Sequence, residues 1–396
     1  MLTAQMLSEQ TLAYGRRVMT ALLGLDALYR RESADGEGLA VVNLDLERRY
    51  VADAFSAYTD ARDCFTRLRV DASLLPEADR RVYYDDLCHS TLAFVKWRTA
   101  GSSLTDQIRG FLHVPAEPAP ASELEGLQQD MSALLTRMGY KGDIRSQCAA
   151  WEDKVRVPAE KVPNVLEGLL DEAWKRTEAR LLKIPRPQSD GMHVVPVTGV
   201  AFNARCNYLN RRIELNVDPT LTRPGLKHLA VHEGYPGHYV QFTMRATLAE
   251  RNEAPADVLL SIVNSASSSV FEGIGDSGIT MLDWMENDDD RVQALMNVYR
   301  AGIGTEAAWQ FHALGWPEEK VAESLARRSL VGGDGWVANR VKFIQSPSRA
   351  VLIWSYWWGE RVVTNAWNRA QPSRGSDFMH FLHSRMHSNR SIEMFE

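Results

Sequence analysis

The chain has 396 residues, of which 45% are hydrophobic and 24% charged, a composition typical of a soluble globular protein with a large core. Its formal net charge of −6 argues against nucleic acid as a partner. No apolar run reaches the roughly 18 residues that a membrane-spanning helix needs. The first residues lack a basic stretch followed by an apolar core, so a cytoplasmic location is expected. Four widely spaced cysteines predict reduced thiols and no disulfide frame.

Helical periodicity dominates the first 190 residues. Apolar residues recur there at three- and four-residue steps, which predicts amphipathic helices. The expected helices cover 12–28, 44–68, 79–96, 122–139 and 164–182. Ser122 and Glu125 have capping-box spacing, which places a helix start at Ser122. Residues 1–190 are therefore expected to form an N-terminal helical lobe and residues 191–396 the part with the candidate site. One continuous domain is the alternative.

The segment 193–217 has a different pattern. It is rich in Val, Thr, Phe, Tyr and Asn, and polar and apolar residues alternate over 212–217, which predicts strands. Pro224 then suits the first turn of a helix that begins near Arg223. Further helices are expected over 256–268, 273–285, 290–314, 317–327, 348–368 and 377–387. The expected fold class is mostly α, with a small β-sheet beside the helix that starts at Arg223.

Residues 232–238 read His-Glu-Gly-Tyr-Pro-Gly-His and carry the strongest functional signal. Neutral imidazoles are good zinc ligands. On a regular helix, however, six residues turn through roughly 600°, which leaves the two histidines about 120° apart and unable to share one ion. Pro236 interrupts the helical hydrogen bonds and Gly237 permits unusual backbone angles. We therefore expect a distorted turn that brings His238 back toward His232.

The run His232–Gln241 resembles the H-E-x-x-P-G-H-H-x-Q signature of the bacterial domain-of-unknown-function 885 family, which is similar in outline to all-helical zinc peptidases. Phe271-Glu272-Gly273 resembles the family's F-E-G-W-A, and the run His312–Trp316 is similar to its D-T-G-x-H-x-x-G-W. The run Pro347–Gly359 is similar, less closely, to P-G-Q-A-x-S-Y-x-x-G. The resemblance covers roughly the C-terminal half. It implies a zincin-like multi-helix fold, with Glu272 as the third metal ligand.

A catalytic zinc ion takes three protein ligands and keeps one position open. His232, His238 and Glu272 would supply these ligands to zinc or to another divalent transition metal. Glu233 would then be the base that takes a proton from the water that the metal activates. Asp276 lies one helical turn after Glu272 and could orient a histidine; a half-exposed polar residue is the other interpretation.

Hydrolysis also calls for a hydrogen-bond donor to the tetrahedral intermediate. His312 and Tyr356 are the candidates because they fall on family-like motifs, and packing in the core is the alternative for each. Departures from the family pattern occur at 274–277, 308–310 and 348–349, beside the expected ligands or donors. They predict a small-molecule or short peptide-like substrate that contacts Trp309 or Arg349. Packing in the core is the alternative for Trp309, and a surface ion pair is the alternative for Arg349.

The sequence thus favours a metallohydrolase that cleaves a peptide or amide bond. A metal-dependent tailoring enzyme that acts without hydrolysis is an alternative, as is a catalytically idle relative that binds a ligand; the base Glu233 argues against the idle relative. His380, His383 and His387 share one expected helical face and could form a rival metal site, but no glutamate adjoins them. The neighbouring Phe378, Phe381 and Leu382 favour instead a terminal helix that packs on the body of the protein. No oligomeric state follows from the sequence.

Overall fold

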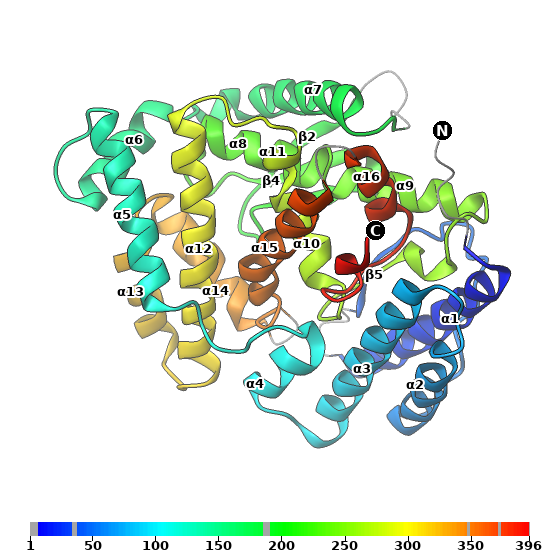
Figure 1. Cartoon of the computed structure of the whole chain (residues 1–396). Helices are drawn as coiled ribbons and strands as arrows, with labels where there is room; N and C mark the ends of the chain where they lie inside the picture. Colours follow the sequence, from blue (N-terminus) through cyan, green and yellow to red (C-terminus); the bar gives the residue numbers. More distant parts are fainter. Residues whose placement is uncertain (1–6, 34–37, 185–190, 347–348, 371–373, 396) are drawn as a thin grey trace. The chain divides into compact units, whose positions relative to one another are not determined.

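The computed structural model describes residues 7–33, 38–184, 191–346, 349–370 and 374–395 (Figure 1). The fold is mostly helical, at 66%, with one sheet of two strands and one of three. The expected fold class, mostly α with a small sheet, is therefore confirmed. Pro347 and Ser348, which belong to the weakest family-like run, lie outside the described residues.

Over the described residues 7–33 and 38–184 the chain is mostly helical, with one short strand at Ala40–Asn43. The helices of this part are α1 (Glu9–Glu32), α2 (Tyr58–Ala72), α3 (Ala78–Ala100), α4 (Leu104–Gln107), α5 (Ala121–Arg137), α6 (Ile144–Val155) and α7 (Val162–Arg180). The helix expected from residue 44 is wrong up to residue 57, because the Asp45 carboxylate accepts the Tyr50 N–H and so competes with helical bonding. The capping box at Ser122 is also wrong. The helix begins one residue earlier, and Pro120 is its N-cap without a side-chain bond.

The strand-rich segment folds as three strands, which confirms that prediction. They are β2 (His193–Val197), β3 (Ala204–Asn207) and β4 (Arg212–Asn216). β4 is central, parallel to β2 and antiparallel to β3, so β3 is an edge strand. The second sheet pairs β1 (Ala40–Asn43) with β5 (Leu260–Ile262). The helix expected over 256–268 is therefore wrong, because a short 3-10 turn leads there into a strand whose backbone pairs with β1.

The second half continues with helices. They are α8 (Arg223–Leu229), α9 (His238–Glu250), α10 (Ser268–Asp276), α11 (Gly278–Met281), α12 (Asp288–His312), α13 (Glu318–Arg328), α14 (Gly333–Gln345), α15 (Ile353–Ala370) and α16 (Gly375–Ser384). The helix expected over 273–285 is split at Ser277 into the end of α10 and α11. The sequence did not indicate α6 or α14.

Two compact units make up the chain. Unit 1 comprises Met1–Ala116, Val240–Gly273 and Trp358–Glu396, and unit 2 comprises Glu117–Tyr239 and Ile274–Trp357. The core of unit 1 includes Phe65, Phe111 and Phe378, and that of unit 2 includes Trp151 and Trp354, all fully buried. Both units draw on residues before and after position 190, and the lobe expected over 1–190 stays a prediction.

All four cysteines are free thiols, as expected. Among the described residues, no helix is long and apolar enough to cross a membrane.

Candidate metal centre

The His-Glu-Gly-Tyr-Pro-Gly-His segment follows directly from helix α8. Thr222 caps this helix, since its Oγ1 accepts the Gly225 N–H at 3.1 Å, and Pro224 occupies the first turn as predicted. After Leu229 the helix widens into a π-helical turn, Ala230–Gly234, which ends at Tyr235. The regular helix that would separate the two histidines is thus interrupted within the segment itself.

Gly237 closes the distorted turn. Its N–H donates to the Val231 carbonyl at 3.0 Å. A Cβ atom on Gly237 would lie only 1.9 Å from the His232 carbonyl oxygen, so no other residue fits this backbone path. As a result the rings of His232 and His238 meet edge to face, with centroids 4.6 Å apart and planes at 81°. The predicted turn at Pro236-Gly237 is confirmed.

His232, His238 and Glu272 form a group, here called the zinc-ligand group, whose ligand atoms all lie within 4.8 Å of one another. Each residue is only 7% exposed. Two imidazole nitrogens and one carboxylate oxygen are a donor set that a catalytic zinc ion uses. This buried cluster could hold a metal ion, and its residue types fit zinc.

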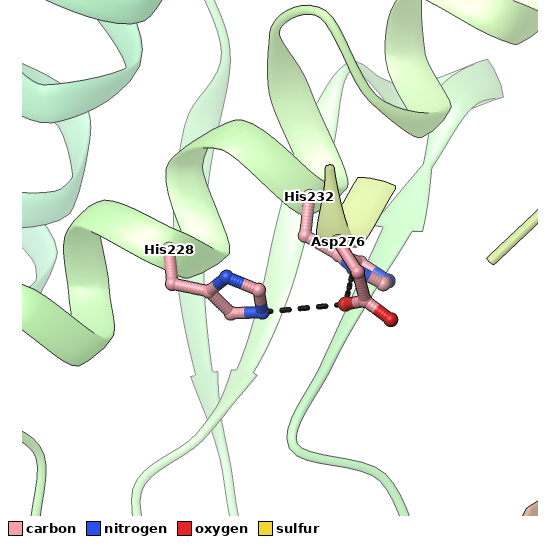
Figure 2. A group of neighbouring side chains, drawn as sticks. All are labelled: His228, His232 and Asp276. Carbon is pink, nitrogen blue, oxygen red and sulfur yellow. Dashed lines mark hydrogen bonds and ion pairs between the residues drawn. The ribbon is translucent and has the colours of Figure 1, made fainter. Parts of the chain in front are cut away.

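Asp276 fixes the orientation of His232 (Figure 2). Its Oδ1 lies 2.8 Å from His232 Nδ1, so the carboxylate accepts the Nδ1 hydrogen and the Nε2 lone pair remains for a metal. Burial raises the pKa of Asp276, but the nearby His232 and His228 outweigh burial and hold this pKa well below its ordinary value. Asp276 therefore stays ionised at neutral pH, and of the two interpretations left open for it the structure shows the contact with a histidine.

Glu233 is held by the edge strand of the three-stranded sheet. Its Oε2 accepts the Cys206 N–H at 2.7 Å, and the side chain is buried. The Asn216 N–H donates to the Asn203 carbonyl, which fixes which residues of β3 form hydrogen bonds with β4. Because these residues alternate along an antiparallel strand, the backbone N–H of Cys206 points away from β4. The small sheet thus lies beside the motif turn, as predicted. Burial, with a contribution from Glu233, raises the pKa of the Cys206 thiol well above its ordinary value.

Glycines let the α10–α11 segment approach the motif turn closely. A Cβ atom on Gly275 would lie 2.6 Å from His232 Nδ1. A Cβ atom on Gly278 would lie 2.1 Å from Val231 Cγ1. Both distances are shorter than side-chain packing tolerates. The position of His232 therefore depends on the absence of a side chain at residues 275 and 278.

The four remaining predicted site residues lie on α12, on α15 or between α14 and α15. His312 ends α12, is exposed, and donates from Nε2 to the Ile344 carbonyl at 2.6 Å. Tyr356 is half-buried, with its ring 6.2 Å from that of Phe343. Trp309 and Arg349 are also half-buried. None of the four belongs to a metal-ligand group among the described residues, and their catalytic and substrate-binding roles stay predictions.

The rival set of three histidines is not among the ligand groups found in the described part of the chain. α16 ends at Ser384, so His387 lies beyond the helix, and its Nε2 donates to the Phe381 carbonyl at 3.0 Å. His383 is fully buried, and burial, with Arg245 and His380, lowers its pKa to about 3. These histidines are part of the packing of unit 1.

Sequence reasoning missed His228. Its Nε2 lies 3.4 Å from the same Asp276 oxygen that contacts His232, as Figure 2 shows. The signal was available, because His228 and His232 are four residues apart and share one helical face. Together with Asp276 they form a second group of possible metal ligands, here called the second group.

Comparisons with known proteins support the fold and no specific activity. No protein-family model matches the chain, and no curated protein matches it. A "putative lipoprotein" from Colwellia psychrerythraea is similar in structure, with a TM-score of 0.55 and 14% identity over 86% of this chain and 66% of that chain. A "putative lipoprotein of unknown function" from Shewanella oneidensis has a TM-score of 0.52 and 14% identity over 85% of this chain and 70% of that one. The chain thus spans about two thirds of the length of these proteins and shares their fold.

Proposed function

We propose that this chain is a zinc-dependent hydrolase that cleaves a peptide or amide bond in a small or modified substrate. The observation that carries the proposal is the buried zinc-ligand group, in which Asp276 orients His232 and Glu233 is the next residue along the chain. The resemblance of the motif to zincin-like peptidases points to the same chemistry. A binding protein would have no need to bury an acid next to such ligands.

A divalent metal in a set of two histidines and one glutamate supplies a Lewis acid and makes a nearby water more acidic. The chain's own residues would do the rest. Asp276 keeps His232 in the tautomer that carries its hydrogen on Nδ1 and its lone pair on Nε2. Cys206 N–H holds Oε2 of Glu233, so Oε1 is the oxygen that takes the proton of the attacking water and later delivers it to the leaving group.

The free edge of β3 suits an extended, peptide-like substrate. The main-chain groups of Ala204 and the Cys206 carbonyl face away from β4, as the pairing register requires, while the Cys206 N–H already donates to Glu233. A short substrate can add to such an edge through main-chain hydrogen bonds, with its scissile bond beside Glu233. Trp309 and Arg349 are the side chains that we propose contact the substrate, the first through an apolar or aromatic group and the second through a carboxylate.

The decisive variant is Glu233→Gln, which keeps the shape of the side chain and removes the base. It should retain bound zinc yet lose about 10²–10⁴-fold in turnover, the usual contribution of general-base catalysis. Glu319→Gln, at an exposed glutamate of α13, is the matched control and should retain both. Parent-like turnover by Glu233→Gln would show that Glu233 is not the base.

The substrate screen should use dipeptides and N-acyl amides in water labelled with heavy oxygen. Hydrolysis places one labelled oxygen in the acid product. Turnover without label would instead identify the metal-dependent tailoring enzyme, in which the same ligands activate a substrate group without adding water. Zinc binding with no turnover of any member of the panel would favour the idle, ligand-binding relative.

A further inference from the structure

His228, His232 and Asp276 converge from two helical segments of unit 2. His228 lies in α8 and His232 one turn later in the π-helical turn, while Asp276 is the last residue of α10. Figure 2 shows His228 Nε2 and His232 Nδ1 directed at the same carboxylate oxygen. Two histidines four residues apart on a helix, with a third donor from a neighbouring segment, is an arrangement that chelates zinc, nickel or copper.

One separation in this group already matches that of two ligands on one ion, and a second is shorter. Ligands held at about 2.0–2.1 Å on a tetrahedral ion lie roughly 3.3–3.4 Å apart. The His228 Nε2–Asp276 Oδ1 separation is 3.4 Å, which is longer than an ordinary N–H···O hydrogen bond. His232 Nδ1 and Asp276 Oδ1 are 2.8 Å apart, so this edge has to open by roughly 0.5 Å on binding.

The surroundings also suit a cation. The side chains of His228 and Asp276 are 19% and 13% exposed, so the group is only partly buried. The nearest cation in sequence, Lys227, pairs with Asp290 at 2.7 Å and with Glu286 at 3.1 Å, so its charge is already compensated.

We propose that the second group is a second divalent-metal position, which shares His232 with the zinc-ligand group. His232 would bind one ion through Nε2 and the other through Nδ1. Binding at the second position breaks the His232 Nδ1–H bond, forms an Nδ1–metal bond and releases the proton to solvent. The position does not depend on the hydrolytic activity proposed above.

Zinc stoichiometry tests this position directly. The metal-free chain and its variants are dialysed against buffers of defined free zinc, and bound zinc per folded chain is measured by mass spectrometry. We expect two equivalents in the parent, the second binding more weakly because it has to displace a proton. His228→Ala and His228→Gln should each bind one equivalent. His193→Ala, at an exposed histidine of β2, is the matched control and should bind two.

The results separate this inference from the proposed function. A parent that saturates at one equivalent, kept in both His228 variants and lost in His238→Ala, overturns the second position and leaves the zinc-ligand group standing. One equivalent that survives His238→Ala and is lost in both His228 variants overturns the zinc-ligand group and supports metal at the second group. Circular dichroism of each variant confirms that lost zinc reflects lost ligands in a folded chain.

Discussion

Gly275→Ala should weaken zinc binding while leaving the chain folded. The added Cβ would lie 2.6 Å from His232 Nδ1, 2.8 Å from Cγ and 2.9 Å from Cε1, whereas ordinary contact begins at 3.4 Å. The imidazole or the end of α10 therefore has to move by 3.4 − 2.6 = 0.8 Å. Metal–ligand distances tolerate only about ±0.2 Å, so a shift of that size takes His232 out of position for the zinc-ligand group.

The substitution changes two free energies, that of unfolding and that of zinc binding. Overpacking typically costs about 1–3 kcal/mol of stability, but alanine in a helix interior returns about 1 kcal/mol relative to glycine. The net loss of stability should therefore be no more than about 2 kcal/mol. Disturbing the partner that orients a metal-bound histidine typically weakens metal binding by about 10–100-fold, or about 1.4–2.7 kcal/mol.

Zinc affinity and urea unfolding, measured on the same samples, test this reasoning. Affinity comes from competition with a chromophoric chelator, and stability from unfolding of the metal-free chain. Gly168→Ala in α7 is the matched control, because a Cβ there meets no atom within 4 Å. It should gain up to about 1 kcal/mol and bind zinc normally. If Gly275→Ala binds zinc as tightly as the parent, the position of His232 does not depend on the absence of a side chain at residue 275.

Three further predictions concern stability and substrate choice. Burial lowers the pKa of His383 from 6.5 to about 3, so the unfolded chain binds the extra proton first and stability falls as the pH drops from 6.5 toward 3. Urea unfolding of His383→Met should show a pH slope that is shallower by up to about 1.4 kcal/mol per unit in that window; an unchanged slope would mean that His383 titrates normally. Thr222→Ala removes the cap of α8 and should lower the free energy of unfolding by about 1 kcal/mol, and a loss below 0.3 kcal/mol would show that the cap contributes little. Trp309→Ala should reduce kcat/KM for an aromatic amide by tens- to hundreds-fold, the equivalent of about 1.5–3 kcal/mol, while an equal effect on a small aliphatic amide would rule out selective contact.

Local patterns in the sequence predicted much of the fold. Periodicity located α1, α3, α7 and α12, and alternation located the strands between residues 193 and 217. The distorted turn was also predictable, because the six-residue spacing of His232 and His238 requires it and Pro236-Gly237 permits it. Each of these inferences depends on residues that are close together in the chain.

The missed features depend on contacts between distant parts of the chain. β5 is a three-residue strand whose pairing partner β1 lies far away in sequence, so the apolar segment after Pro255 indicated a helix. In the sequence, His228 shows only a four-residue spacing from His232. Its place in a possible ligand group depends on its contact with Asp276, which lies on another helix. The roles of His312 and Trp309 were inferred from the family pattern, which fixes positions in sequence and does not determine what these side chains contact.

The structure changes the meaning of one departure from the family pattern. Residues 274–277 were interpreted, with 308–310 and 348–349, as a sign of an unusual substrate. Ile274 is, however, buried, Gly275 packs its backbone against His232, and Asp276 accepts the His232 hydrogen. A bulky residue at 275 would displace the imidazole, and a residue without a carboxylate at 276 would leave Nδ1 without this partner. The departure at 274–277 therefore supports the geometry of the candidate metal site, and only the departures at 308–310 and 348–349 still favour a narrow substrate range.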